Sequence, residues 1–375
     1  MKIAHIINTM GSGGAEKLLT ELLPSIQGFE HESILIVLNK NGSKEEYINI
    51  LSNKGIKTIF VKNSGLLYSP IYIPLLRRIL NIEKPDVIHV HLFPAQYWTV
   101  LACLFKLKFK PILVTTEHNN NNRRIGNSLF KIIERFIYSR FDKIIAISPN
   151  VKQCLINWVV PSTNITMIHN GVALNKVRSA EKIDLQQILN LSDNYKNYYY
   201  LLMVARFEKQ KDHETLIKAM DLLPDNFILL LAGEGSLKSN AELLAQKSSQ
   251  KNRILFLGYR NDVYSLMKSV NLNILSTNYE GFSGVTLEML GTGTPFIGSD
   301  VVGVNDIATD PEFLFSKGNH KELANKILKI YESKDLQNYL SELGIKIAEK
   351  FSINLMVSSY LNLYTDLFNK YNKLK

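Results

Sequence analysis

Short apolar runs alternate with stretches of helical spacing along the whole chain. The runs have strand length, and the stretches between them repeat apolar residues every three or four positions. Such alternation favours parallel sheets covered by helices. In the first half, the predicted strands are residues 3–8, 33–38, 58–61, 87–92, 111–118, 143–148 and 165–169. The predicted helices between them are residues 15–26, 44–52, 75–80, 95–105 and 128–139.

A charged and polar stretch at residues 178–197 separates this series from a second one. The second series predicts strands at residues 198–204, 227–232, 254–257, 272–275 and 296–298, and helices at residues 215–222, 241–247 and 263–268. The chain has 375 residues, more than one hydrophobic core usually supports. We therefore predict an α/β protein with two Rossmann-like, doubly wound parallel-sheet domains, at residues 1–180 and 196–352.

One apolar stretch without Asp, Glu, Lys or Arg, residues 87–105, has the length of a membrane span. It contains His89, His91, Pro94 and Gln96, and it divides into a strand pattern and an apolar helix pattern. We therefore expect a buried strand and helix. The cysteines, Cys103 and Cys154, lack metal-site spacing, which favours a reduced, cytoplasmic setting without a disulfide framework.

The excess of positive charge lies in the first half of the chain. Residues 1–180 contain 22 Lys and Arg against 11 Asp and Glu, whereas the whole chain has a net charge of +10. A basic half favours an anionic partner, which can be a membrane surface, a lipid-linked phosphate or a nucleic acid. The basic, amphipathic segment from Arg123 to Arg140 is the candidate for a membrane surface. The alternative is a helix with its apolar side on the sheet and its basic side in water.

Two carboxylates, Glu280 and Glu288, lie on either side of a turn with glycines that opens a helix. The first N–H groups of a helix lack internal partners and can bind phosphate, and here they belong to Ser283, Gly284 and Val285. Carboxylates repel a phosphate but accept hydrogen bonds from vicinal hydroxyls. The pattern therefore predicts a ligand with phosphates between two polyols, as in a nucleotide sugar.

Two cations, Arg206 and Lys211, follow the first predicted strand of the second series. Arg can bind a diphosphate as a fork and Lys as a point charge. Because no Asp-x-Asp follows a predicted strand, we expect these cations and the helix N-terminus to replace a metal ion. His89 and His91 alternate with apolar residues on one strand, which favours a place in the core or along a cleft. A metal site would need further ligands.

The paired glutamates, with seven residues between them, resemble the signature of retaining glycosyltransferases of the family 4 type. The resemblance extends from the glycine-rich segment at residues 11–16 through residues 205–211 to residues 293–300. It implies the GT-B fold, in which two Rossmann-like domains face a cleft. It also implies that the last helix, about residues 355–375, packs back onto the first domain.

The resemblance also implies roles for single residues. Glu288 would bind the ribose hydroxyls, and Glu280 would contact the transferred sugar. Backbone contacts to the phosphates and the sugar are expected from Phe282, Ser283, Gly284, Val285 and Thr286. The first domain would contribute Gly13 and Gly14 near the diphosphate and acceptor, and His118 near the donor sugar.

Further strand ends would border the nucleotide, and the implied residues are Gly233, Tyr259 and Arg260, the last two near the base. The catalytic set is then His118, Glu280, Arg206 and Lys211. Three positions depart from the family pattern: Ala205 and Asp212, where Gly is common, and Asp306, where Glu is common. The first two affect the expected geometry of the loop that carries Arg206.

The expected reaction is transfer of a hexose from a nucleoside diphosphate sugar, with uridine as the default base. The acceptor would be a hydroxyl of a glycan or lipid-linked molecule in surface polysaccharide or glycoconjugate biosynthesis. The resemblance also implies retention by a front-face mechanism, in which the diphosphate departs from the face that the acceptor attacks. No cofactor or metal is expected.

Two alternatives remain at this point. A nucleotide-sugar 2-epimerase of GT-B fold would bind the same donor without an acceptor. A basic nucleic-acid-binding protein would account for the charge, but carboxylates beside a phosphate track would oppose its binding. We therefore expect no nucleic-acid partner.

Overall fold

The computed structural model describes residues 1–11, 13–104, 107–118, 127–188 and 198–372. The chain divides into two compact units. The first contains residues 1–171 together with the C-terminal segment from Ile353, and the second contains residues 172–352.

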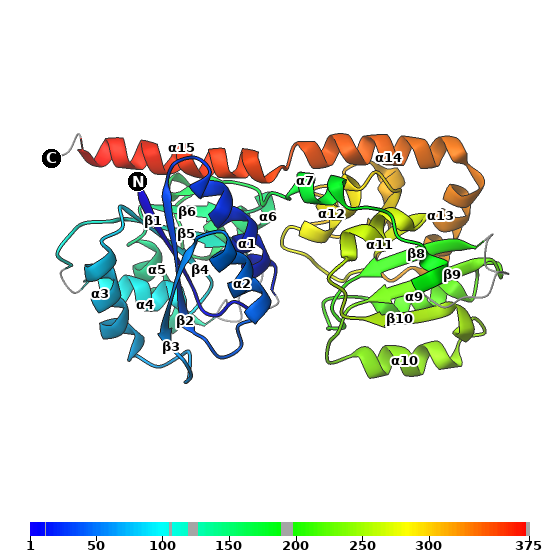
Figure 1. Cartoon of the computed structure of the whole chain (residues 1–375), viewed down its shortest axis with the longest axis horizontal. Helices are drawn as coiled ribbons and strands as arrows, with labels where there is room; N and C mark the ends of the chain where they lie inside the picture. The colour runs from blue at the N-terminus through cyan, green and yellow to red at the C-terminus, as the bar shows by residue number, and fades with distance from the viewer. Residues whose placement is uncertain (12, 105–106, 119–126, 189–197, 373–375) are drawn as a thin grey trace. The chain divides into compact units, whose positions relative to one another are not determined.

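The first unit is built on a parallel sheet in the order β3-β2-β1-β4-β5-β6-β7, counting strands within the described residues (Figure 1). The strands are β1 (Lys2–Ile7), β2 (Glu32–Asn39), β3 (Lys57–Lys62), β4 (Val87–His91), β5 (Ile112–Glu117), β6 (Lys143–Ala146) and β7 (Ile165–Met167). The helices are α1 (Gly14–Gln27), α2 (Glu45–Asn53), α3 (Tyr72–Glu83), α4 (Ala95–Leu104), α5 (Ser128–Tyr138), α6 (Pro149–Trp158) and α15 (Ile353–Asn372).

Helices cover both faces of this sheet. One group of helices contains α1, which contacts α2 and α15. In the other group, α3 contacts α4 and α4 contacts α5 (Figure 1). The chain reverses its direction across the sheet after β3, so right-handed crossovers place these two groups on opposite faces. Strands covered on both sides read as continuous apolar runs, which is why β1, β2 and β4 were visible in the sequence.

The second unit repeats this plan with a parallel sheet in the order β10-β9-β8-β11-β12-β13 among the described strands. The strands are β8 (Tyr199–Val204), β9 (Phe227–Ala232), β10 (Ile254–Gly258), β11 (Leu272–Leu275), β12 (Phe296–Ser299) and β13 (Leu314–Phe315). The helices are α7 (Leu174–Ser179), α8 (Leu185–Ile188), α9 (His213–Met220), α10 (Lys238–Lys247), α11 (Val263–Ser269), α12 (Gly284–Gly291), α13 (His320–Glu332) and α14 (Lys334–Glu349).

The chain order reverses beside the first strand of each sheet. In the first unit the reversal lies between β1 and β4, and in the second between β8 and β11. The chain segments that leave neighbouring strands there continue into helices on opposite faces of the sheet, and in such folds a crevice can form between them at the carboxyl ends of the strands. Ligands of doubly wound sheets bind in such crevices. The loops after β8 and β11 carry the cations and Glu280 of the sequence analysis.

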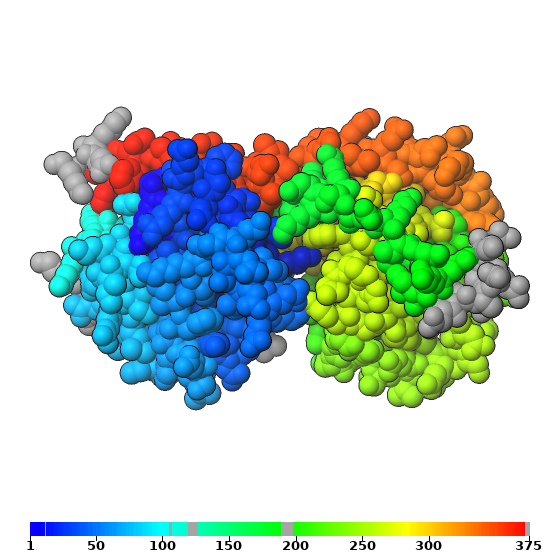
Figure 2. All heavy atoms as spheres, viewed as in Figure 1, coloured from blue at the N-terminus to red at the C-terminus, as the bar shows by residue number. Residues whose placement is uncertain are grey.

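The division between the units lies at Gly171, earlier than the predicted boundary at residue 180. α7 belongs to the second unit, where Leu174 and Val177 pack against α12 at Gly291. The space-filling view shows the green segment that contains α7 against the yellow part of this unit (Figure 2). The sequence analysis also missed α6, α13, α14 and the two-residue β13.

Candidate functional site

Two loops meet at the reversal point of the second sheet. The cation loop, residues 205–212, follows β8, and the glutamate loop, residues 276–283, follows β11. The Asp212 N–H donates to the Ser276 carbonyl at 3.0 Å. Further bonds run from the Asn278 N–H to the Gln210 carbonyl at 2.8 Å and from Gln210 Nε2 to the Tyr279 carbonyl at 2.9 Å. These hydrogen bonds join the two loops at the strand ends. We call the joined loops, residues 205–212 and 276–283, the shelf.

Glu280 and Lys211 form an ion pair on this shelf, and both side chains are largely buried. Gln210 Nε2 donates to the second carboxylate oxygen at 3.0 Å, and the Thr277 hydroxyl donates to the first at 3.1 Å. The structure thus brings two of the predicted catalytic residues together. It also shows that Lys211 has a carboxylate partner already, so a diphosphate at this position would have to share the cation with Glu280.

The N-terminus of α12 offers fewer free amides than the sequence predicted. Ser283 is the N-cap residue, and its N–H donates to the Gly303 carbonyl at 3.0 Å. That N–H is therefore unavailable to a phosphate, which corrects the prediction for Ser283. Within the described part of the chain, the N–H groups of Gly284 and Val285 make no hydrogen bond. No atom lies within 4 Å of the position of a Cβ at Gly284, so an anion could approach there.

Three residues around this helix end are buried. Phe282 is buried with its ring 5.4 Å from that of Phe351. The Thr286 N–H donates to the Ser283 hydroxyl at 3.4 Å, and the predicted backbone contact of Thr286 with the ligand stays a prediction. Glu288 is buried, and its Oε1 accepts a hydrogen bond from the Tyr264 hydroxyl at 3.0 Å. The Tyr264 bond holds this carboxylate in one orientation.

Arg206 is exposed on the cation loop, and glycines hold the loop close to its neighbour after β9. A Cβ at Gly233 would collide with the Ala205 carbonyl, and a Cβ at Gly235 would collide with the Phe207 backbone. Gly233 therefore has a structural role, because only a residue without a side chain allows this approach. The predicted contact of Gly233 with the nucleotide stays a prediction.

The pair predicted near the base lies after β10. Tyr259 is 53% exposed, whereas Nε and Nη2 of Arg260 donate to the two carboxylate oxygens of Asp262, at 2.8 and 2.6 Å. The carboxylate of Asp262 raises the pKa of Arg260. The Arg260 side chain is thus already paired, which leaves backbone contacts as its expected role.

The sequence analysis missed three residues of this site. Gln210 and Thr277 bind Glu280, and Gly303 accepts the hydrogen bond from Ser283. Gly303 has a φ of +84°, and a Cβ there would lie 2.7 Å from Glu280. A signal existed for Thr277, a polar residue directly after a buried strand. The positive φ of Gly303 depends on a contact between loops that no local pattern reveals.

In the first unit, the predicted glycines differ in access. Gly13 is the N-cap residue of α1, and the Glu16 carboxylate lies where a Cβ of Gly13 would be. A diphosphate approaching Gly13 would meet that negative charge. Gly14 has no atom within 4 Å of its Cβ position and is open. In this conformation the structure favours Gly14 over Gly13 as a ligand contact.

His118 lies half-buried directly after β5, and its Nε2 is 3.1 Å from Nδ1 of the buried His91. Burial lowers the pKa of His118 to about 4. The imidazole is therefore neutral at neutral pH and can both donate and accept a hydrogen bond. Its neighbour Glu117 accepts hydrogen bonds from Gln96 and Tyr138, so Glu117 has structural partners.

We expect acid to destabilise the first unit through its buried histidines. Burial lowers the pKa of His5 to about 3 and those of His89 and His91 well below the ordinary value. The unfolded chain binds protons at these residues below about pH 6.5, whereas the folded chain does not. Stability is therefore complete above pH 6.5 and falls as the pH is lowered toward 4, by up to about 1.4 kcal/mol per pH unit for each histidine.

Urea unfolding between pH 7.5 and 5 measures this slope. The substitution His5→Phe should reduce this slope by the contribution of one histidine. Equal slopes for wild type and His5→Phe would contradict the prediction.

Comparison with known proteins covers nearly the whole chain. The model described as Glycosyltransferase Family 4 matches residues 12–176, and the model described as Glycosyl transferases group 1 matches residues 186–347. The UDP-Gal:alpha-D-GlcNAc-diphosphoundecaprenol alpha-1,3-galactosyltransferase of Escherichia coli is 26% identical over 98% of this chain and 97% of its own length. An N-acetylgalactosaminyltransferase of Campylobacter jejuni, whose name specifies a diphospho-undecaprenol-linked substrate, is 27% identical over 83% of this chain and 84% of its own.

Solved structures share the architecture. Anabaena HepE in complex with UDP and glucose has a TM-score of 0.83 at 19% identity, and the match covers 98% of this chain and all of HepE. A glycosyltransferase of Rickettsia africae has a TM-score of 0.82 at 21% identity, over 97% of this chain and 98% of its own. These similarities confirm the predicted GT-B fold. Among the described residues, no helix is both long and apolar enough to span a membrane. The chain belongs to the GT-B glycosyltransferases of the family 4 type.

Proposed function

We propose that this glycosyltransferase moves a hexose, with retention, from a UDP-sugar to a hydroxyl of a lipid-linked or other glycan acceptor in surface polysaccharide or glycoconjugate biosynthesis. The observation that carries the donor part is the shelf at the reversal point of the second sheet, where Lys211 and Glu280 are paired. The acceptor part is supported by two relatives whose names specify diphosphoundecaprenol-linked sugars. A structural neighbour was solved with UDP and glucose, which supports the choice of donor.

The groups on the shelf suit a diphosphate between two sugars. Arg206 can grip phosphate oxygens as a fork, and the free amides of Gly284 and Val285 add the positive end of α12. Lys211 can bridge the diphosphate and Glu280, since its ammonium has three donors. Glu288 can accept hydrogen bonds from the ribose. Charge that develops on the leaving diphosphate would then be stabilised by fixed groups of the protein.

The acceptor hydroxyl needs a base as the bond to the diphosphate breaks. In the proposed front-face reaction, an oxygen of the departing diphosphate takes that proton. His118, as a neutral imidazole, would form a hydrogen bond to an oxygen of the sugar substrate. The proposed mechanism assigns no step to a metal, so we expect activity to persist in EDTA.

The two alternatives are less well supported. The relatives are named as transferases, and the paired carboxylates oppose a polyanion. Product analysis separates the possibilities, because an epimerase would convert the donor without an acceptor. Transfer requires both substrates and releases the nucleoside diphosphate.

The test is a screen of nucleoside diphosphate sugars for thermal stabilisation, followed by product analysis with a diphosphoundecaprenol-linked sugar as acceptor. Arg206→Ala should weaken donor binding by about 10- to 100-fold, because a charge-assisted contact contributes about 1.5–3 kcal/mol. The matched control is Lys209→Ala, which removes an exposed cation from the same loop and should change nothing. Equal donor affinity of wild type and Arg206→Ala would refute the assigned role, and no stabilisation by any donor would refute the function.

We further propose that α5 rests on an anionic membrane surface on the cytoplasmic side. Its inner side is buried at Glu134 and Ile137, yet Leu129 and Ile132 are 66% and 70% exposed. Phe136 is also exposed, as are the cations Lys131, Arg135 and Arg140. The outer side of α5 is therefore both apolar and basic. The alternative given in the sequence analysis, a helix with its apolar side on the sheet, placed only basic residues in water. Arg123 and Arg124 of the predicted segment lie outside the described residues.

Sedimentation with vesicles measures this association. Binding should require an anionic lipid such as phosphatidylglycerol and should weaken with salt. Leu129→Glu combined with Ile132→Glu should reduce it at least about tenfold, because each apolar side chain contributes more than about 1 kcal/mol when buried. Leu243→Glu, at a similarly exposed leucine of the second unit, is the control. Unchanged binding of the double variant would contradict the proposal.

A further inference from the structure

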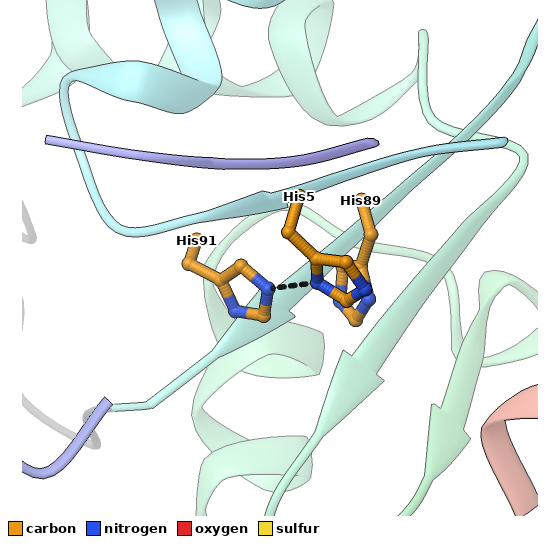
Figure 3. Close-up of side chains that lie close together, drawn as sticks. All are labelled: His5, His89 and His91. Atoms are coloured by element: carbon orange, nitrogen blue, oxygen red, sulfur yellow. Dashed lines mark hydrogen bonds between the residues drawn. The ribbon is translucent and has the colours of Figure 1, made fainter. Parts of the chain in front are cut away.

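Three imidazoles form a hydrogen-bonded chain from the core of the first unit to His118. His5 on β1 and His91 on β4 are fully buried, and His5 Nδ1 lies 3.1 Å from His91 Nε2 (Figure 3). The other nitrogen of His91, Nδ1, lies 3.1 Å from His118 Nε2. Because β1, β4 and β5 are neighbours in the sheet, the chain runs across three strands on one face.

The protons in this chain must all point the same way. Each neutral imidazole has one N–H donor and one bare nitrogen that accepts. If His5 donates through Nδ1, then His91 accepts at Nε2 and donates through Nδ1 to His118. If the order is reversed, His118 donates inward through Nε2. All three tautomers change between the two orders. Outside the two hydrogen bonds, the orders differ in whether His5 Nε2 or His118 Nδ1 carries the proton.

The buried end decides between the two orders. Within the described structure, His5 Nε2 is buried and has no hydrogen-bond partner. Buried donors without a partner are rarer than buried acceptors without one. The order with a bare His5 Nε2 is therefore favoured over the order with an N–H there. At the half-buried end, His118 Nδ1 can be either protonated or bare, because solvent or a substrate can accept a hydrogen bond from it or donate one to it.

We infer that His5 and His91 are positioning residues that hold His118 in its Nδ1–H tautomer, so that it presents a hydrogen-bond donor to an oxygen of the sugar substrate. The use of that donor depends on the proposed function, whereas the tautomer itself does not. In water, free histidine prefers the Nε2–H tautomer. The hydrogen-bonded chain thus holds His118 in the Nδ1–H tautomer, which is the less populated one for free histidine.

A metal ion is the competing explanation for this cluster. One nitrogen each of His5, His89 and His91 can be chosen so that all lie within 4.8 Å of one another. Both nitrogens of His89 already have partners, the Tyr364 hydroxyl at 2.6 Å and the Thr116 hydroxyl at 2.7 Å. A metal bound by all three residues would have to displace one of these and break one of the two bonds of His91, either to His5 or to His118. The hydrogen-bonded chain needs no such rearrangement.

The direct test is ¹⁵N NMR of the full chain labelled at histidine, at pH 7.5 and without substrate. Two-bond couplings from the ring protons distinguish the two neutral tautomers, and His→Gln variants assign the signals. We expect Nδ1–H for His118, His91 and His5. An Nε2–H signal for His118 in the wild type would overturn the inference, whether or not the chain proves to bind a nucleotide sugar.

Variants on β4 provide a matched pair. His91 and His89 are both fully buried, but only His91 contacts His118. His91→Phe should shift His118 toward Nε2–H and lower kcat with a nucleotide sugar by about tenfold, with a smaller change in KM. His89→Phe should leave the His118 tautomer unchanged. If both variants, or neither, alter the tautomer, the assigned role of His91 is wrong.

Metal analysis completes the test. Protein purified without chelator should contain less than a tenth of an equivalent of zinc, and added Zn²⁺ should leave the histidine spectrum unchanged. One tightly bound equivalent that is lost in His5→Phe would overturn the chain and establish the metal site.

Discussion

Glu288→Ala is expected to weaken binding of the donor by more than about 100-fold. The buried carboxylate of Glu288 is proposed to accept two hydrogen bonds from the ribose, and each such bond to a charged group contributes about 1.5–3 kcal/mol. Calorimetric titration with the UDP-sugar found in the screen measures the loss. Glu288→Gln, which keeps the shape and one acceptor oxygen, should lose less.

The control for this prediction is Tyr264→Phe. It removes the hydroxyl that donates to Glu288 at 3.0 Å and leaves the carboxylate in place. Its expected effect is several-fold at most, because the carboxylate loses orientation and not its charge. A Glu288→Ala protein that binds the donor as tightly as wild type would exclude Glu288 from the site.

Lys211→Met is expected to lower the free energy of unfolding by about 3–5 kcal/mol. The side chains of Lys211 and Glu280 are only 13% and 9% exposed, so the substitution leaves a carboxylate buried without its cation. Gln210 and Thr277 still donate to that carboxylate, which places the expected loss toward the lower end of the range. Urea unfolding of the full chain gives the value.

The double variant distinguishes a buried ion pair from simple loss of packing. Lys211→Met with Glu280→Gln removes both charges, so it should recover most of the stability while remaining inactive. If the double variant is as unstable as the sum of the two single variants, the residues do not interact and the shelf is held by other contacts.

Much of this fold could be read from the sequence because its strands are buried on both faces. The apolar runs of β1, β4, β8 and β9 differ sharply from the helices between them, and the order of elements then dictates parallel sheets. The missed elements lacked such contrast. α13 and α14 follow one another without a strand between them, and β13 has only two residues.

The site was predictable to the extent that strand ends converge. Arg206, Lys211 and Glu280 each follow a strand next to the reversal point, so their loops had to be neighbours. Lys211 pairs with Glu280, which lies 69 positions away, through side-chain packing. The hydrogen bond from the Ser283 N–H to the Gly303 carbonyl depends on how two loops pack. No local pattern encodes either contact. For the same reason His5 was overlooked, since its partners lie on β4.

The C-terminal helix α15 has a consequence for the order in which the protein is made. Tyr360 and Tyr364 of this helix are completely buried in the first unit, and Tyr364 bonds to His89. The second unit contains all of its own elements by Ser352. A chain emerging from the ribosome can therefore finish its second unit first. The part of the first sheet that α15 covers, beside α1 and over β5, must stay exposed until this helix has been synthesised.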